Sequence, residues 1–268
     1  MPGTLYLIPV PLGEHSPPAG VLAPDTLNQL QRLKTFVVEH EKTARHFLKA
    51  ASHPLPIQQI RLMPLNEHTA ANDVAALLQP LLAGEDIGLM SEAGCPGVAD
   101  PGAALVALAH DRGITVRPLV GPSSLLLALM ASGLNGQSFA FSGYLPVEAA
   151  SREQKIRQLE QRSASGNETQ LLIETPYRNA QLFAALLQAC RPDTRITVAT
   201  DVSLPSESIV TRSVEKWRTV PLPDFDKRPT VFLLLAVAAR NGSGQHGKAE
   251  NRVKPNHFGG ASRPRRKP

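Results

Sequence analysis

One stretch constrains this chain more than any other: an apolar run that stops at a loop rich in glycine and proline, followed by a helical pattern. The apolar run is Ile87 to Met90, the loop is Ser91 to Gly102, and the helical pattern is Ala103 to His110. That order predicts a strand, a shaped loop and a helix. In an open α/β sheet, such loops lie at the carboxyl ends of the strands, where ligands bind. Its glycines permit a close approach of ligand to backbone and its prolines stiffen it, so we expect a site formed mainly by backbone N–H and C=O groups.

The residue order in this loop is specific, because it reads Ser-Glu-Ala-Gly-Cys-Pro-Gly-Val-Ala-Asp-Pro-Gly from Ser91 to Gly102. It resembles the Ser-Asp-Ala-Gly-Thr-Pro-x-x-x-Asp-Pro-Gly loop of the ribosomal RNA small subunit methyltransferase I family. That family is part of the tetrapyrrole methylase superfamily, which binds S-adenosylmethionine. A tight turn without a ligand needs one glycine and not this whole series. The resemblance implies cofactor contacts at Ser91, Glu92, Ala93, Gly94, Pro96 and Val98.

Other loops resemble the same family. The predicted first strand, Thr4 to Ile8, ends at Pro9-Val-Pro-Leu-Gly13, which is similar to a Pro-x-Pro-x-Gly-Asn loop with Glu14 in place of the Asn. Gly121-Pro-Ser is similar to a Pro-Gly-Pro-Ser/Cys-Ala loop, although Ser123 is also a candidate helix cap. In the second half, Glu174-Thr-Pro-Tyr-Arg178 resembles Tyr-Glu-Ser-x-x-Arg. The resemblance implies further cofactor contacts at Pro11, Gly13, Gly121, Pro122, Ser123, Thr175 and Thr230.

Methylation of a ribose hydroxyl, which the resemblance implies, calls for a group that accepts the hydroxyl proton. Glu39 stands where the family has Ala-Glu-Asp-Thr-Arg, and Glu67 and His68 stand where it has Asp-His-Asn-Glu. These three residues are the candidate catalytic residues, with Glu92 as a further candidate, and the sequence does not choose among them. A charged cluster that opens a helix also fits a solvated face, and a histidine between a strand and a helix also fits a cap.

The alternation of strand and helix patterns predicts an α/β protein. The resemblance spans Thr4 to Val237 and implies two α/β domains of the tetrapyrrole-methylase fold, 1–118 and 119–240, with the cofactor cleft between them. The pattern predicts one helix over 70–82 and, because residues 125–133 are apolar nearly all round, a helix buried between the domains. The additional carboxyl-terminal domain of the family is expected to be absent, which would make this chain a divergent short form.

The excess of basic residues in this chain lies in its last 28 residues, 241–268. The formal net charge is +5, but seven of the 28 Lys and Arg residues and only one of the 23 Asp and Glu residues lie beyond residue 240. The first 240 residues therefore carry a net charge of −1. Residues 241–268 are polar and without hydrophobic period, which predicts a disordered basic tail. Such a tail can contact nucleic acid or only keep the protein soluble, and both interpretations stay open.

Neither the cysteines nor the apolar runs indicate another class of protein. Cys95 and Cys190 are far apart and without metal-ligand spacing, so we expect two free thiols and no metal site. A nucleophilic Cys95 would need a partner base that the sequence does not place, and the family has Thr there. No apolar run reaches the roughly 20 residues of a membrane span, and no signal peptide is visible. We expect a cytoplasmic protein without a membrane partner.

The leading hypothesis is an S-adenosylmethionine-dependent methyltransferase that modifies the 2′-hydroxyl of a ribose, that of a cytidine, in small-subunit ribosomal RNA. The resemblance implies a homodimer that acts on this RNA or on a 30S-type subunit. Two alternatives remain: a methyltransferase for a small molecule such as a tetrapyrrole, and a non-catalytic binding protein associated with the ribosome. The stretch Ala199 to Leu204 lacks the basic residues of the family, which weakens the RNA assignment more than the cofactor assignment.

Overall fold

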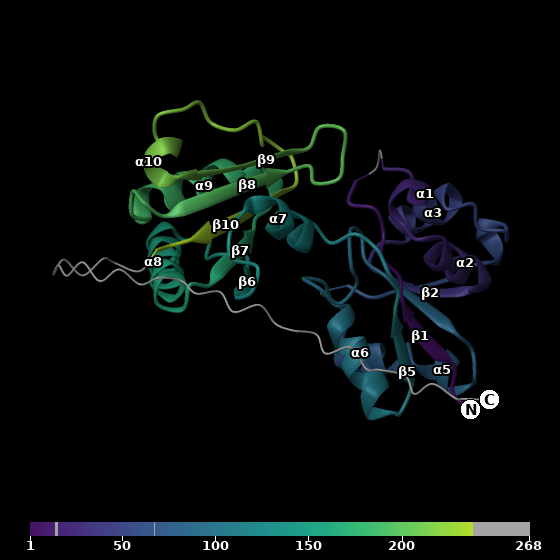
Figure 1. Ribbon diagram of the computed structural model, residues 1–268. Coiled ribbons are helices and arrows are strands. Elements are labelled where there is room, and N and C mark those ends of the chain that lie inside the picture. The colour runs from purple at the N-terminus through teal and green to yellow at the C-terminus, as the bar shows by residue number, and fades with distance from the viewer. Residues whose placement is uncertain (14–15, 67, 238–268) are drawn as a thin grey trace, which may run out of the picture. The chain divides into compact units, whose positions relative to one another are not determined.

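A computed structural model of the chain describes residues 1–237, apart from 14–15 and 67 (Figure 1). These residues belong to one compact unit that contains two sheets of five strands each. The predicted tail, 241–268, lies outside the described residues. The division of the chain into domains between residues 118 and 119 stays a prediction.

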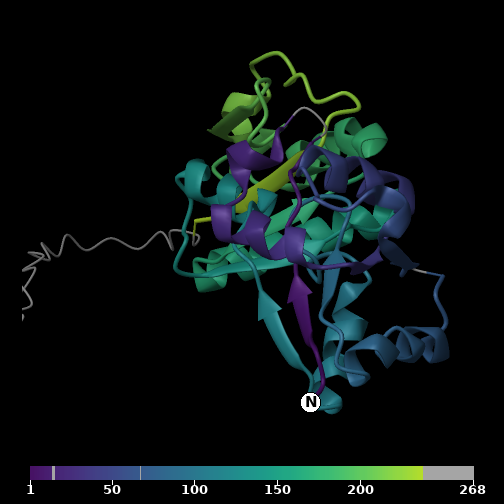
Figure 2. The same cartoon turned by 90° about the vertical axis from the view of Figure 1, so that its right-hand side faces the viewer.

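The first sheet is wholly parallel, as the predicted βα order requires. Its central strands are continuous apolar runs, which is typical of parallel sheets covered on both faces. In Figure 2 the purple arrow of β1 and the teal arrow of β5 lie side by side and point the same way. In the order β3-β2-β4-β1-β5, the strands are Arg61–Pro64, Thr35–Val38, Ile87–Met90, Thr4–Leu7 and Thr115–Pro118.

Two apolar clusters fill the faces of this sheet. Successive residues of a strand point to opposite faces, and accordingly Leu5 and Val37 belong to one cluster while Tyr6 and Phe36 belong to the other. The helices around the sheet are α1 (Pro18–Val21), α2 (Pro24–Arg32), α3 (Glu41–Ala50), α4 (Ala71–Ala76), α5 (Gln79–Leu82) and α6 (Gly102–Asp111), with the 3-10 helix η1 (Ile57–Gln59).

The prediction of one helix over 70–82 is wrong. The segment forms two helices, α4 and α5, with a break at Leu77 and Leu78. Pro80 has no backbone N–H and its ring clashes with the preceding turn of a continuous helix, but it is well accommodated in the first turn of a new one. The chain therefore restarts the helix at Gln79.

The second sheet is mixed, with β6 parallel to β7 and the remaining pairs antiparallel. In the order β6-β7-β10-β8-β9, its strands are Phe139–Gly143, Thr169–Ile173, Thr230–Leu235, Arg195–Thr200 and Ser208–Ser213. Its helices are α7 (Ser124–Ser132), α8 (Ala149–Gly166), α9 (Asn179–Ala189) and α10 (Val214–Trp217), with the 3-10 helix η2 (Pro176–Arg178).

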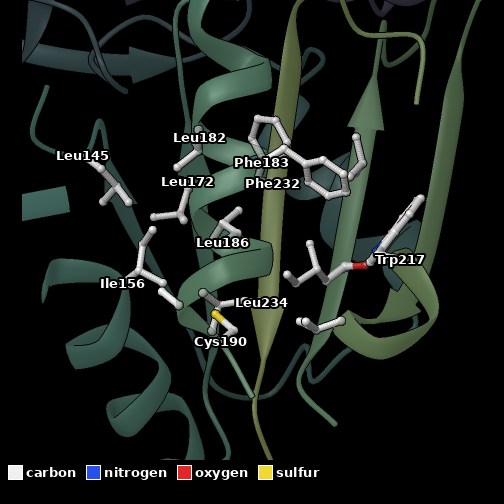
Figure 3. Close-up of a cluster of buried hydrophobic side chains, with 14 of the residues drawn as sticks. Leu145, Ile156, Leu172, Leu182, Phe183, Leu186, Cys190, Trp217, Phe232 and Leu234 are labelled. Carbon is white, nitrogen blue, oxygen red and sulfur yellow. The ribbon is translucent and has the colours of Figure 1, made fainter. Parts of the chain in front are cut away.

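A cluster of buried side chains lies beneath α8 and α9 (Figure 3). The ring of Phe183 meets those of Trp217 and Phe225 edge-on, with centroids 5.4 and 5.5 Å apart, a favoured arrangement of aromatic pairs. Leu145, just after β6, is buried in the same cluster. The loop that follows β6 is therefore anchored to the core.

Helix α7 does not have the predicted burial on all sides. Ala128 and Leu129 pack against the second sheet in a cluster with Leu171, Val231 and Leu233. The opposite face is exposed, because Met130 is 80% exposed and Leu126 is 51% exposed. A nine-residue helix resting on one sheet buries one face only. None of the described helices is both long and apolar enough to cross a membrane.

Candidate functional site

A cavity of about 480 Å³ lies where several loops and strands converge, within the usual range of about 300–1,000 Å³ for small-molecule sites. Glu39 directly follows β2, Ser91 directly follows β4 and Leu12 lies in the loop after β1, so the cavity stands at the carboxyl ends of these strands. The second half of the chain contributes the start of α7 and residues of β6, β7, β8 and β10. The lining residues from the first half are Leu12, Glu39, Ser91, Glu92, Ala93, Gly94, Cys95, Val98, Ala99 and Asp100.

Gly94 ties the loop after β4 to the loop after β1. Its N–H donates to the carbonyl of Val10 at 3.1 Å, and its own carbonyl accepts from the N–H of Val10 at 2.9 Å. Its φ is +75°, and a Cβ atom at this position would stand 3.3 Å from Cδ2 of Leu12. Both the left-handed backbone and the close contact favour glycine, and they keep this part of the wall free of side-chain atoms.

Asp100 holds the second half of the same loop. Its Oδ1 accepts hydrogen bonds from the N–H groups of Gly97, at 2.8 Å, and Gly102, at 2.7 Å. Burial raises the pKa of Asp100, and these hydrogen bonds oppose the rise. Next to it, Ala99 has a φ of +61°, a conformation that costs energy for a residue with a side chain. One carboxylate oxygen therefore fixes the loop around its strained residue.

Replacing Asp100 with alanine is expected to lower the free energy of unfolding by about 1–3 kcal/mol, because two loop N–H groups lose their acceptor. Chemical denaturation of the purified variant measures the change. Asp100→Asn keeps an acceptor oxygen at the same position, so it is expected to retain most of the stability. Equal stability of the alanine variant and the natural protein would contradict this role.

Two further carboxylates face the cavity near Asp100. Burial raises the pKa of Glu39, the negative charge of Glu92 raises it further, and a hydrogen bond from the backbone of Glu92 lowers it. The hydroxyl of Thr43, in α3, donates to Oε1 of Glu92 at 3.1 Å. The charge of Asp100 also raises the pKa of Glu39. This part of the cavity is therefore negatively charged and suited to a cationic ligand.

The wall from the second half of the chain is held by polar contacts. Asp201 has a φ of +49°, and its Oδ2 accepts from Nε of Arg228 at 2.9 Å and from the hydroxyl of Ser206 at 2.6 Å. Glu174 accepts from the guanidinium of Arg178 at 2.6 Å. These contacts fix the loops that follow β8 and β7. The lining residues from this half are Ser123, Ser124, Leu125, Phe141, Tyr144, Ile173, Glu174, Pro176, Ala199, Asp201, Val202, Pro229, Thr230 and Val231.

The structure brings together about half of the residues singled out from the sequence. Those that line the cavity are Ser91, Glu92, Ala93, Gly94, Val98, Ser123 and Thr230 and, from the catalytic candidates, Glu39. Those that do not line it are Pro11, Gly13, Pro96, Gly121, Pro122, Thr175 and His68. Glu67 lies outside the described residues. The cofactor and catalytic roles of all of them stay predictions.

Two of the residues that do not line the cavity support its wall. A Cβ atom on Gly121 would stand 2.3 Å from Cβ of Pro9, so only glycine lets these two loops meet. The carbonyl of Pro122 accepts from the thiol of Cys95 at 3.4 Å. Burial raises the pKa of that thiol, which disfavours the reactive thiolate. Cys95 therefore contributes to the wall as a neutral group.

Sequence reasoning assigned no role to Phe141, Tyr144 or Asp201, which all line the cavity. Asp201 stands in the stretch that departs from the family motif. The signal near Tyr144 was Gly143, a glycine at the end of a strand, which often marks a bulge. Such a glycine indicates that the backbone changes direction, but it does not indicate which side chain is redirected as a result.

Comparison with known proteins identifies the family. Residues 4–217 match the family model "Tetrapyrrole (Corrin/Porphyrin) Methylases". The ribosomal RNA small subunit methyltransferase I of Vibrio cholerae is 28% identical over 90% of this chain and 79% of its own length. The protein of the same name from Synechocystis is 32% identical over 75% of this chain and 67% of its own length.

A solved structure shares the fold. The uroporphyrin-III C-methyl transferase from Thermus thermophilus, complexed with S-adenyl homocysteine, aligns with a TM-score of 0.53 at 17% identity, over 87% of this chain and 97% of its own. The comparisons confirm the fold and the class of enzyme inferred from the sequence, an S-adenosylmethionine-dependent methyltransferase. The chain belongs to the tetrapyrrole methylase family.

Proposed function

We propose that this protein methylates the 2′-hydroxyl of a ribose, that of a cytidine, in small-subunit ribosomal RNA. The observation that carries the proposal is the cavity in which the glycine-rich loop and Glu39 meet. The curated relatives, which are named for the small-subunit ribosomal RNA that they methylate, support the choice of acceptor. An RNA substrate of this kind implies a cytoplasmic enzyme.

The residues of the cavity fit S-adenosylmethionine, which when bound supplies a methyl group on a positively charged sulfur. Glu39, Glu92 and Asp100 offer negative charge to that cation. Gly94 presents backbone in place of a side chain. Displacement at a methyl group depends chiefly on alignment of the reacting groups, and the bonds that fix the loops around Gly94 and Asp100 provide a rigid frame for it.

Glu39 is the proposed acceptor of the ribose proton. Of the described catalytic candidates, Glu39 and Glu92 line the cavity and His68 does not, and Glu39 is the more buried of the two that do. Its raised pKa makes it a stronger base than an ordinary glutamate, and a general base works best when its pKa lies near the working pH. Glu39 therefore lies at the cavity and is basic enough to accept the ribose proton.

The acceptor is tested by supplying labelled S-adenosylmethionine with one of three purified acceptors: small ribosomal subunits, large ribosomal subunits or a tetrapyrrole such as uroporphyrinogen III. We expect label in the RNA of the small subunit alone. Label in the tetrapyrrole without label in RNA would replace the proposal with small-molecule methylation. Binding to small subunits without any transfer would favour a non-catalytic role.

We also propose a homodimer that buries the exposed face of α7. Leu126 and Met130 are four residues apart, so they lie on one face of the helix, and both are exposed. Large apolar side chains exposed together commonly mark interfaces. Light scattering on a sizing column is expected to give twice the chain mass for the natural protein, and the single-chain mass for Leu126→Glu/Met130→Glu. A monomeric natural protein would refute the dimer. Leu222→Glu, at another exposed position, is the control.

A further inference from the structure

Four aromatic side chains among the described residues are exposed, and two of them line the cavity. Phe141 and Tyr144, 37% and 57% exposed, are lining residues. Phe139 and Tyr177, 44% and 78% exposed, are not. Most other described aromatic rings are buried. We propose that Tyr144 and Phe141 form a stacking surface for a base of the RNA substrate, an inference that rests on the function proposed above.

The chain redirects its path so that Tyr144 reaches the cavity. The pairing of β6 with β7 shifts register between Phe141 and Gly143, which is the sign of a β-bulge. Gly143 has a φ of +64°, and a Cβ atom there would meet no atom within 4 Å, so the glycine serves the backbone and not the packing. Bulges beside active sites commonly re-aim a side chain. This bulge precedes the residue that enters the site.

The residue that follows Tyr144 fixes it from the other side. Leu145 is buried in the cluster beneath α8 and α9 (Figure 3). Tyr144 is thus held between a bulge and a buried anchor, while its own ring stays more than half exposed. A ring that is exposed yet held in place loses little conformational freedom when a ligand stacks on it.

The cavity has a buried part and an exposed part. Gly94, Ala199 and Thr230 line it and are buried, which suits a cofactor that must be shielded from water, whereas Glu92, Ala93 and Val98 line it and are exposed. Tyr144 and Phe141 also line it on the side of the second sheet and are exposed to solvent, from which the RNA arrives. They therefore lie where an incoming nucleotide can reach them.

Charge indicates which part of the nucleotide they meet. Glu39, Glu92 and Asp100 line the same cavity, and their negative charges repel phosphate. A base is neutral and has two flat faces, and proteins that recognise unpaired RNA commonly stack bases on aromatic rings. Enzymes that modify one nucleotide often take it out of the helical stack. The exposed rings are therefore suited to hold the displaced base while its ribose enters the cavity.

The test compares matched pairs of variants in the methylation of small ribosomal subunits. Tyr144→Ala is expected to lower kcat/KM about 5- to 150-fold, the range for loss of one base–aromatic stack, whereas Tyr177→Ala leaves it unchanged. Phe141→Ala is also expected to lower kcat/KM, whereas Phe139→Ala is expected to leave it unchanged. Phe139 is the matched control because it lies two residues away on the same face of β6.

Substitutions that keep or remove the ring distinguish stacking from simple packing. Tyr144→Phe is expected to retain kcat/KM near the natural value, and Tyr144→Leu is expected to behave like Tyr144→Ala. Calorimetric titration with S-adenosylhomocysteine is expected to give unchanged affinity for each variant. Reduced cofactor affinity in Tyr144→Ala, or full activity in Tyr144→Leu, would overturn the inference. If the natural protein binds cofactor but methylates no RNA, the proposed function fails and the stacking surface fails with it.

Discussion

Replacing Gly94 with valine is expected to abolish measurable binding of S-adenosylhomocysteine. Gly94 lines the cavity at a φ of +75°, and its Cβ position already stands 3.3 Å from a methyl group of Leu12. A branched side chain there enters the space that the cofactor needs and strains the backbone. We expect affinity to fall by about 100-fold or more, equal to about 2.7 kcal/mol. Calorimetric titration measures the loss.

Gly97 supplies the matched control for this experiment. It lies in the same loop at a φ of +80°, but a Cβ atom there would meet no atom within 4 Å, and it does not line the cavity. Gly97→Val therefore introduces comparable backbone strain without filling the site. It is expected to lose stability while keeping most of its affinity. An equal loss of affinity in both variants would mean that loop strain, and not the filled cavity, prevents binding.

Replacing Glu39 with glutamine is expected to lower kcat by about 100- to 10,000-fold, the usual contribution of a general base. Glutamine has nearly the same shape but does not accept the ribose proton as a base. Cofactor affinity is expected to change much less, because Glu92 and Asp100 still supply negative charge to the cavity. Single-turnover methylation gives the rate of transfer. If Glu39→Gln transfers the methyl group as fast as the natural protein, Glu39 is not the base.

The pH dependence of kcat/KM gives a second test of the same residue. Activity needs the ionised carboxylate, so it falls as the pH drops through the pKa of Glu39. Burial and the charge of Glu92 raise that pKa, which places the acidic limb of the profile above the ordinary glutamate value of about 4.3. Glu92→Gln removes one cause of the rise and keeps the backbone hydrogen bond. Its acidic limb is expected at lower pH, and an unmoved limb would exclude Glu39 as the titrating group.

Much of the fold and part of the site could be predicted from local sequence. The strand from Ile87 to Met90 is confirmed, because a short run without charged residues that ends at a loop rich in glycine and proline leaves few alternatives. Gly94 belongs to an ordered motif, so its loop could be found, and the structure places it at the cavity.

Other features were not predicted, for physical reasons that differ from one place to the next. The helix predicted over 70–82 breaks at Leu77 and Leu78 because of Pro80. The spacing of apolar residues continues through Pro80, so the pattern alone did not indicate the break. The exposed face of α7 could not be inferred, because an apolar helix gives no sign of which neighbour covers it. Gly143 signals a change of direction next to Tyr144, but the sequence does not show that the bulge and the buried Leu145 place this ring at the cavity.

The most direct test of the account is to identify the atom that receives the methyl group. Small ribosomal subunits that lack the modification are incubated with the natural protein and labelled S-adenosylmethionine, and the RNA is digested to nucleosides for mass spectrometry. The account predicts one labelled nucleoside, a cytidine that carries the methyl group on its ribose, and no labelled product with Glu39→Gln in the same time. A methyl group on a base, or no product from a folded protein that binds the cofactor, would contradict it.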